Sequence, residues 1–292
     1  MVQLVSALIV TTVYGLPAAV VGLPFALRAN TAVSLAALVA APVVYSVLFV
    51  LVAGLISVPF QKAIVPGKFP RSWSHPIYRA RRIYGLCWTC VYYCKPVYFV
   101  CLSIPALKWL TFRLFGYRGS MDFTVYPDTW IRDLPLLKFG EGAYVSNRAT
   151  LGTNIALSNG MILVDRIEIG RKALVGHLSM IAPGVIMGEE SEVGVGCRIG
   201  IRVELGDRSF VNGASSINHH TKIGPDASIG NQAYLGMRVR VGPGIELPSG
   251  IIVPSRVNLS TQAAAARFFS AETSELPSSP PVTLDARTIQ EQ

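Results

Sequence analysis

The sequence has few charged residues and few histidines for its length. Only 15% of its 292 residues are charged and 51% are hydrophobic, more apolar than an ordinary soluble domain, so part of the surface is expected to face lipid. The four histidines, His75, His177, His219 and His220, leave few candidates for proton transfer or metal binding. Nucleic-acid-binding motifs are also lacking. The net charge of +9 therefore favours phosphates or lipid headgroups over nucleic acid as partners.

Cysteine is scarce and clustered. Four of the five cysteines fall between Cys87 and Cys101, unlike the spaced, even-numbered framework of a small secreted domain. A reducing compartment is the simpler interpretation.

Two long stretches near the N-terminus contain no charge at all. They cover residues 4–26 and 31–60, and each exceeds the roughly 20 residues needed to span a bilayer. No Lys or Arg precedes Arg28, which argues against a cleavable signal peptide because that would begin with basic residues. Residues 1–60 are therefore predicted to form two transmembrane helices.

Basic residues distinguish the two sides of these spans. Arg28 alone lies between them, whereas residues 61–120 begin with a basic juxtamembrane run, which predicts that both ends face the cytoplasm. The run contains Lys62, Lys68, Arg71, Arg79, Arg81 and Arg82. Residues 83–115 then mix aromatic and basic side chains, which favours an interfacial or re-entrant segment. The alternative is a third crossing, which would reverse the side of everything that follows.

The second half of the chain repeats every six residues. Every sixth residue from Phe139 to Leu259 is large and apolar, and glycine often follows it. Such a period predicts short strands that point one large and one small residue inward, with glycine permitting the bend between strands. Three strands close a coil of eighteen residues. After a lead-in at 121–138, residues 139–260 are therefore predicted to form a parallel β-helix of about seven coils without a long interruption.

This repeat resembles the left-handed β-helix of the hexapeptide-repeat superfamily, which includes acyltransferases and gamma-class carbonic anhydrases. The resemblance implies left-handed coils and a homotrimer. The segments DLPLLKFGEGAYVSNRATLGTNI, ALVGHLSMIAPGVIMGEESEVGVG and INHHTKIG, which follow the hydrophobic stretches, are similar to the membrane-embedded C-terminal region of poly-lysine-synthetase-type nonribosomal peptide synthetases. That similarity implies a peptide synthetase or carrier protein as partner.

The expected architecture is thus an all-β left-handed parallel β-helix with an N-terminal α-helical membrane anchor. Residues 261–292 contain a short predicted helix, Thr261 to Phe269, and then a polar, proline-containing end. This tail is expected to be disordered.

One histidine matches the superfamily's catalytic pattern. Asn218 and His219, followed by Ile223 and Gly224, are similar to the Asn-His-Asp…Ile-Gly segment of sugar O- and N-acetyltransferases. The resemblance implies that His219 is the general base, with Asn218 beside the substrate. His220 replaces the acidic neighbour that often follows the base. His220 and His177 are the alternative bases, and solvated imidazoles without a catalytic role are the remaining interpretation.

Residues eighteen apart should stack in vertical columns. One column contains Arg148, Arg166, Gly184, Arg202, His220, Arg238 and Arg256, and Lys222 and Arg240 lie beside it. Toward the C-terminus these cations have no obvious counterion in the sequence. We predict that Lys222, Arg238, Arg240 and Arg256 hold the phosphates of coenzyme A or of a phosphopantetheine carrier. A solvated face, or contact with acidic lipids or a partner subunit, are the alternatives.

The combined prediction is an integral membrane acyltransferase whose β-helix lies on the cytoplasmic side. It would move an acetyl or aminoacyl group from acetyl-CoA or a phosphopantetheine thioester to a hydroxyl or amine, in nonribosomal peptide or secondary-metabolite biosynthesis. No tightly bound cofactor or metal is expected. A non-catalytic scaffold that docks a synthetase or carrier domain is the main alternative. Gamma-class zinc chemistry is disfavoured because no second histidine follows His177 near Met180 to Pro183.

Overall fold

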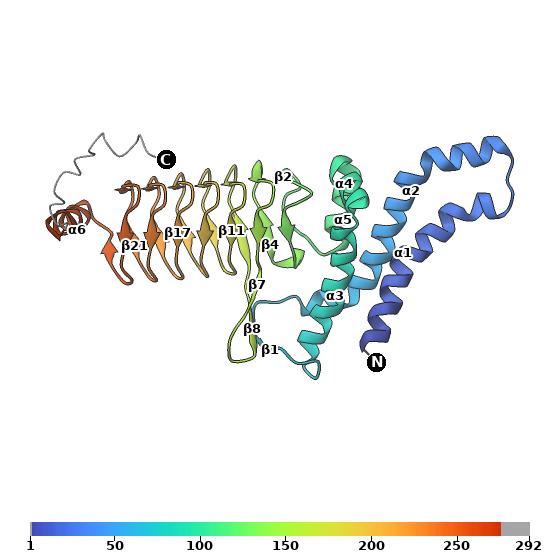
Figure 1. Ribbon diagram of the computed structural model, residues 1–292, viewed down its shortest axis with the longest axis horizontal. Helices are drawn as coiled ribbons and strands as arrows, with labels where there is room; N and C mark the ends of the chain where they lie inside the picture. The colour runs from blue at the N-terminus through green and yellow to red at the C-terminus, as the bar shows by residue number, and fades with distance from the viewer. Residues whose placement is uncertain (1, 276–292) are drawn as a thin grey trace, which may run out of the picture.

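The computed structural model describes residues 2–275 and shows a long β-helix with a group of helices at its N-terminal end (Figure 1). The chain begins with α1 (Val2–Ala26) and α2 (Thr31–Ser57), which is continued by the 3-10 helix η1 (Val58–Ala63). The two apolar stretches have mean hydropathies of 2.0 and 2.6, and only 17% of each is buried. Both are long and apolar enough to cross a membrane, as the sequence predicted.

Three shorter helices close the first coil of the β-helix. They are α3 (Pro76–Tyr93), α4 (Lys95–Ser103) and α5 (Pro105–Leu114). The indole N–H of Trp88 donates to the carbonyl of Ile131 at 2.6 Å, and the Tyr84 hydroxyl donates to the carbonyl of Phe115 at 2.9 Å. This cap covers the open end of the coil, where an apolar core and unpaired strands would otherwise face solvent.

The segment predicted to be interfacial therefore divides into two parts. Trp88, Tyr98 and Phe112 are fully buried in the cap, whereas Tyr93 and Trp109 are exposed. A bend of 82° separates α3 from α4, and the pair reaches the length and hydropathy of a span only if both helices are taken together. The third crossing thus stays an alternative.

The β-helix has three faces, each a parallel sheet of seven strands. Face I contains β2 (Phe123–Val125), β5 (Ala143–Val145), β10 (Leu174–Val175), β13 (Glu192–Val193), β16 (Phe210–Val211), β19 (Ser228–Ile229) and β22 (Glu246–Leu247). Face II contains β3 (Trp130–Ile131), β6 (Thr150–Leu151), β11 (Met180–Ile181), β14 (Arg198–Ile199), β17 (Ser216–Ile217), β20 (Tyr234–Leu235) and β23 (Ile252–Val253). Face III contains β4 (Leu137–Phe139), β9 (Ile167–Ile169), β12 (Ile186–Met187), β15 (Glu204–Leu205), β18 (Lys222–Ile223), β21 (Arg240–Val241) and β24 (Asn258–Leu259).

The six-residue period positions the core as predicted. Ile199 pairs with Ile217, and Ile217 pairs with Leu235, on consecutive rungs of face II. All three side chains are at most 2% exposed. A parallel β-helix is therefore confirmed.

The glycine that follows each large residue has a different role from the one predicted. Gly200 does not have a positive φ, whereas the αL corner positions hold residues such as Arg202 and His220, with φ of 53° and 61°. A Cβ at Gly200 would lie 2.8 Å from the backbone nitrogen of His219 on the next coil. Glycine at this position therefore permits close stacking of coils rather than the bend.

The predicted register is wrong at Leu157 and Leu163. These residues lie in an antiparallel hairpin, β7 (Asn154–Ala156) and β8 (Met161–Val164), which leaves the β-helix after β6 and pairs with β1 (Gly67–Pro70). Leu163 pairs with Lys68 there instead of filling the coil. The reason is that Asn159 and Gly160 form the turn of a hairpin, and Gly160 has a φ of 75°, a conformation that glycine adopts easily.

The beginning of the β-helix also differs from the prediction. Strands β2, β3 and part of β4 lie within residues 121–138, which were expected to be a lead-in. The seven coils therefore run from Phe123 to Leu259. The two extra strands at the start replace the two hexads of the hairpin, which is why the predicted number of coils is nevertheless correct.

The chain continues past the last coil as α6 (Gln262–Glu275), longer than the helix expected at Thr261 to Phe269. The tail predicted to be disordered also includes residues 276–292, and these residues lie outside the described part of the chain.

Candidate functional site

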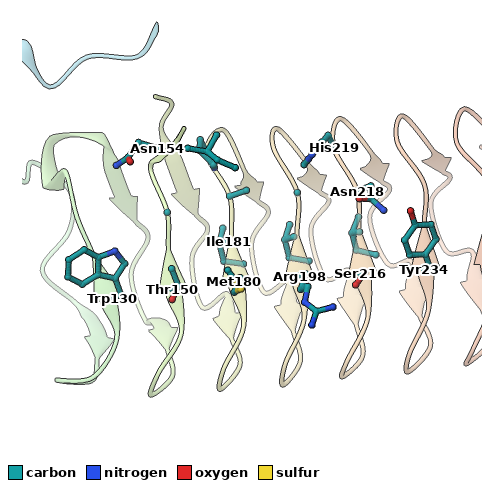
Figure 2. Close-up of a pocket in the computed structure, with 17 residues that line it drawn as sticks. Trp130, Thr150, Asn154, Met180, Ile181, Arg198, Ser216, Asn218, His219 and Tyr234 are labelled. Atoms are coloured by element: carbon teal, nitrogen blue, oxygen red, sulfur yellow. The ribbon is translucent and has the colours of Figure 1, made fainter. Parts of the chain in front are cut away.

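A cavity of about 500 Å³ lies along face II and its border with face III. Six of its lining residues are the first, outward-facing residues of successive face II strands: Trp130, Thr150, Met180, Arg198, Ser216 and Tyr234. The short side chains of Thr150 and Ser216 lie among the longer ones of this column, and the cavity extends from β3 to β20. Figure 2 shows these side chains along the face, with Asn154, Asn218 and His219 toward one edge.

The predicted pair Asn218 and His219 lines this cavity. Both residues follow β17 directly, at the corner where the chain turns from face II to β18 on face III. The side-chain amide of Asn218 donates to the carbonyl of Leu235 at 2.9 Å, which fixes it against the next coil. The hexapeptide register therefore brings an imidazole and an amide to one edge of the hollow.

A hydrogen bond defines the protonation pattern of His219. Its Nδ1 accepts from the backbone N–H of Ile201 at 2.9 Å. In the neutral ring, Nδ1 therefore carries the lone pair and Nε2 carries the proton. As observed, the imidazole presents a donor at Nε2, and proton uptake by Nε2 requires the ring to leave Ile201.

His220 occupies the exposed αL position of the same corner. Partial burial lowers its pKa, and the neighbouring charges of Arg202 and Arg238, together with His219, lower it further. His220 is therefore neutral at physiological pH, but its side chain is not among those that line the cavity.

His177 lies on a different corner, where the chain turns from β10 on face I to β11 on face II. It does not line the cavity that contains His219. Within residues 2–275, no group of three or more His, Cys, Asp or Glu side chains could hold a metal ion. Within one chain, His177 therefore lies apart from the corner that holds His219 and His220.

The four predicted phosphate-binding cations divide between two places. Arg238 and Arg256 are αL residues of the II–III corner, stacked above His220. Lys222 and Arg240 project from neighbouring strands of face III. There Lys222 pairs with Glu204 at 2.7 Å, so the prediction that Lys222 lacks a counterion is wrong. The register places the acid one rung below the lysine, where the two side chains meet.

The predicted arginine column is also shorter than expected. Arg166, Gly184, Arg202 and His220 stack at the II–III corner, but Arg148 stacks below Leu178 at the I–II corner. The twelve residues of the hairpin insertion do not add a turn of the β-helix. Residues that are eighteen apart but lie before and after the hairpin, such as Arg148 and Arg166, are therefore at different corners of the β-helix.

Sequence reasoning missed the side chains that shape the cavity. Arg198 and Tyr234 line it on the outward side of face II, and Tyr234 is 47% exposed. No ion pair involves Arg198 within the described residues. These side chains could have been found from the sequence, because the residue before each inward residue points outward and recurs every eighteen positions on one face. On face II these residues include Met180, Arg198, Ser216 and Tyr234.

Comparison with known proteins gives structural neighbours only. No protein-family model matches the sequence, and no curated protein sequence matches it. The acetyltransferase domain of PglB from Neisseria gonorrhoeae, in complex with acetyl coenzyme A, is 18% identical with a TM-score of 0.26, over 51% of this chain and 62% of that one. Perosamine N-acetyltransferase from Caulobacter crescentus, in complex with CoA and GDP-perosamine, is 16% identical with a TM-score of 0.30, over 51% and 60%.

A serine acetyltransferase from Entamoeba histolytica is 12% identical with a TM-score of 0.23, over 57% of this chain and 66% of that one. The structural neighbours are thus acetyl- and acyltransferases, and this chain spans about three fifths of the length of the first ones. Identities below 20% and TM-scores of 0.30 or less do not carry an activity from those proteins to this one.

Proposed function

We propose that the protein is an acyltransferase that moves an acyl group from a thioester to a hydroxyl or amine in the cavity of face II. The observation that carries this proposal is the position of His219. Its imidazole lines a hollow of about 500 Å³ together with Asn218 and the outward side chains of face II. An imidazole in such a hollow is a suitable group for proton transfer to or from a bound substrate.

The proposed reaction needs one proton to move twice. The acceptor oxygen or nitrogen attacks the thioester carbonyl and loses its proton to His219, and the carbon–sulfur bond then breaks. The departing thiolate takes the proton back, so the imidazole returns to its initial state. Asn218 is proposed to orient the acceptor.

Proton uptake requires a change at His219. Because Nδ1 accepts from Ile201, Nε2 of the neutral ring is a donor in the free protein. We propose that the bound acceptor draws the ring away from Ile201, since catalytic hydrogen bonds often form only when the substrate is present. If the ring stays in place, Nε2 can instead donate a hydrogen bond to the developing oxyanion.

The donor is proposed to be acetyl-CoA or a phosphopantetheine thioester. Arg238 and Arg256 at the II–III corner and Arg240 on face III belong to no ion pair in residues 2–275. None of the three lines the cavity itself, but the backbone N–H of Arg238 donates to the carbonyl of His219 on the coil below. Guanidiniums without a counterion suit the phosphates of such a donor. Lys222, which Glu204 neutralises, is the weakest member of this proposed set.

The setting of the reaction is also a proposal. The two apolar helices support a membrane anchor, and the basic residues after α2 support a cytoplasmic β-helix. The homotrimer, and a peptide synthetase or carrier protein as partner in peptide or secondary-metabolite biosynthesis, follow from the sequence resemblance. Apolar side chains are exposed on face II, including Met180 at 54% and Ile252 at 63%. Their exposure supports the proposal that another subunit or a partner protein covers this face.

One observation favours a second candidate function, a non-catalytic scaffold. The hydrogen bond from Ile201 occupies the lone pair of His219 that a base would use, and no carboxylate contacts this ring among the hydrogen bonds of the described residues. A scaffold would dock a synthetase or carrier domain on the same face without chemistry.

Three substitutions of His219 separate these roles. The full-length protein in detergent is assayed for acetyl transfer from acetyl-CoA to a panel of amines and alcohols. His219→Ala removes the imidazole, His219→Asn keeps an acceptor near Nδ1, and His219→Gln keeps a donor near Nε2. If His219 is the base, all three lower turnover at least about a hundredfold.

His177→Ala is the matched control, because this imidazole lies on another corner, and its turnover should equal that of the unaltered protein. Retention of most activity by His219→Gln alone would establish hydrogen-bond donation in place of base catalysis. Full activity of His219→Ala contradicts the site. Absence of saturable acetyl-CoA binding, measured by calorimetry, contradicts the acyltransferase and favours the scaffold.

A further inference from the structure

A second group of charged side chains lies outside the cavity that contains His219, where α3 meets the first coil. The carboxylate of Asp133 is fully buried and lies 2.6 Å from Nη2 of Arg81, which is 3% exposed. The Thr153 hydroxyl and the Asn154 amide donate to the same carboxylate oxygen at 2.7 and 3.1 Å. A buried ion pair thus joins the helical cap to the β-helix.

The positive charge around this pair exceeds what Asp133 can neutralise. Burial raises the pKa of Asp133, but the charges of Arg81 and Arg132 outweigh that effect and bring it below its usual value. Asp133 is therefore ionised and offsets one guanidinium. Arg71 and Arg82 add two more positive charges, and neither belongs to an ion pair in the described chain.

These arginines surround a cavity of about 210 Å³. Arg71, Arg81, Arg82 and Arg132 line it, together with Tyr78, Asn154, Ala156 and Ile162. This lining, which falls wholly within described residues, contains no carboxylate. Nη1 of Arg81 and Nε of Arg132 are buried without a hydrogen-bond partner, and Nε of Arg132 lies 3.7 Å from Oδ1 of Asp133, which also lacks a hydrogen bond. Buried donors of this kind are costly to leave unpaired, so the cavity is chemically suited to an anion with several oxygens.

An apolar cleft of about 450 Å³ lies beside this cavity. It is formed between the beginning of α1 and the first half of α3, with Val5 and Ile9 on one side and Ile83 and Leu86 on the other. The polar side chains that also line it are Gln3, Ser6 and Arg79. Arg82 lines both the cleft and the arginine cavity. Because α1 is long and apolar enough to cross a membrane, a chain in this cleft would be continuous with the hydrocarbon of a bilayer.

We propose that the cavity and the cleft together bind one membrane lipid that ends in a phosphomonoester or diphosphate. The arginines hold the phosphate oxygens, and Val5, Ile9, Ile83 and Leu86 contact the first part of the hydrocarbon chain. A headgroup with two negative charges matches three uncompensated guanidiniums better than a singly charged phosphodiester does. Neither an apolar ligand nor a free anion would use both parts of the site.

The position of Asn154 extends this inference to the acceptor, a step that rests on the proposed function. Asn154 lines the arginine cavity and also the face II cavity that contains His219. From β6 to β17 the strand order passes β11 and β14, three rungs or about 14 Å at roughly 4.8 Å each. A group carried on the lipid phosphate can therefore extend along face II toward His219, which makes a lipid-linked acceptor the substrate class.

The binding test uses full-length protein in detergent micelles without an acyl donor. Dioleoyl phosphatidic acid is titrated, in parallel with dioleoylglycerol, dioleoyl phosphatidylglycerol, dihexanoyl phosphatidic acid and inorganic phosphate. Saturable binding is expected for dioleoyl phosphatidic acid, at least about tenfold tighter than for the others. Arg82→Gln and, separately, Arg71→Gln should each weaken it about tenfold or more. Both side chains are exposed, so the fold should persist.

Arg267→Gln is the matched control, since it removes one exposed positive charge from α6 at the other end of the molecule, and it should bind as the unaltered protein does. If Arg267→Gln weakened lipid binding as much as Arg82→Gln and Arg71→Gln do, the binding would reflect general charge attraction, and the proposed site would be overturned. If inorganic phosphate bound as tightly as dioleoyl phosphatidic acid, the assignment of a lipid would be overturned. If phosphatidylglycerol bound as tightly, the assignment of a doubly charged headgroup would be overturned. His219→Ala should leave binding unchanged, so failure of the proposed activity does not affect this result.

Discussion

The repeated coils and the first coil with its helical cap are stabilised in different ways. From β10 onward the interior contains large apolar side chains and small residues such as Ser215 and Ala233, and the ionic side chains stay outside. The first coil instead encloses a carboxylate, Asp133, paired with a buried arginine from α3. Stability is thus distributed over similar rungs in one region and concentrated in one polar network in the other.

The same types of side chain have different energetic weight in these two regions. Arg208 and Asp226 form a bidentate pair at 2.7 and 2.9 Å on the outside of the coils, but both side chains are more than half exposed. Arg81 and Asp133 are almost completely buried. Water can replace the partner in the first pair and cannot do so in the second.

The largest expected effect comes from Asp133→Asn. This substitution leaves the guanidinium of Arg81 buried without a counterion, which we expect to lower the free energy of unfolding by about 3 to 5 kcal/mol. Denaturant unfolding of the full-length protein in detergent measures it. Asp226→Asn is the control and should leave the midpoint unchanged. Equal effects of the two substitutions would remove the distinction between the regions.

The pH dependence of the same variant checks the cause. The pKa of Asp133 is lowered in the folded protein, so its carboxylate stabilises the fold above the unfolded-state pKa, roughly 3.9. That contribution is lost as the pH falls through the folded pKa. The stability difference between the unaltered protein and Asp133→Asn should therefore be constant near neutral pH and should narrow below about pH 4. If this stability difference instead widened at acid pH, an ionised Asp133 in the folded protein would be contradicted.

The second-largest expected effect compares Ile217 and Leu157, two large apolar residues on the same predicted six-residue period. Ile217 is 1% exposed in the coil interior, and Ile217→Ala should cost about 2 to 5 kcal/mol because it leaves a cavity between rungs. Leu157 lies half-buried in the hairpin, so Leu157→Ala should cost less than half as much. Thermal unfolding under matched conditions measures both, and equal losses would restore the uninterrupted register.

These two regions also explain how much of the fold was predictable. Ile199, Ile217 and Leu235 belong to a long run of apolar residues with one six-residue period, and a stacked coil accounts for so long a run, so the β-helix follows from the sequence. Leu157 falls on the same period by coincidence, because it lies half-buried in the hairpin and outside the coil. The cap depends on contacts between Trp88 or Arg81 and residues about fifty positions away, and no local pattern specifies those contacts.

The candidate site was predictable to a similar extent. Asn218 and His219 follow an inward position directly, so the register alone places them at a corner beside face II. The partner of His219 Nδ1 is the backbone N–H of Ile201, which has no signature in the side-chain sequence. Likewise, the pairing of Lys222 with Glu204 depends on which rung lies below, a detail that the total charge of the patch does not reveal.

The smallest expected effect compares two glycines that line the same cavity, Gly152 after β6 and Gly200 after β14. A Cβ at Gly200 would lie 2.7 Å from Nδ1 and 2.8 Å from the backbone nitrogen of His219, whereas at Gly152 its nearest neighbour is the carbonyl oxygen of Ile181 at 3.5 Å. Gly200→Ala should therefore cost about 1 to 3 kcal/mol by overpacking and displace His219, so that acyl transfer falls with stability. Gly152→Ala, next to the hairpin that leaves the β-helix after β6, should leave both unchanged. Because both residues line one cavity, a loss of activity in Gly152→Ala would show that the cavity wall rather than the position of His219 controls the reaction.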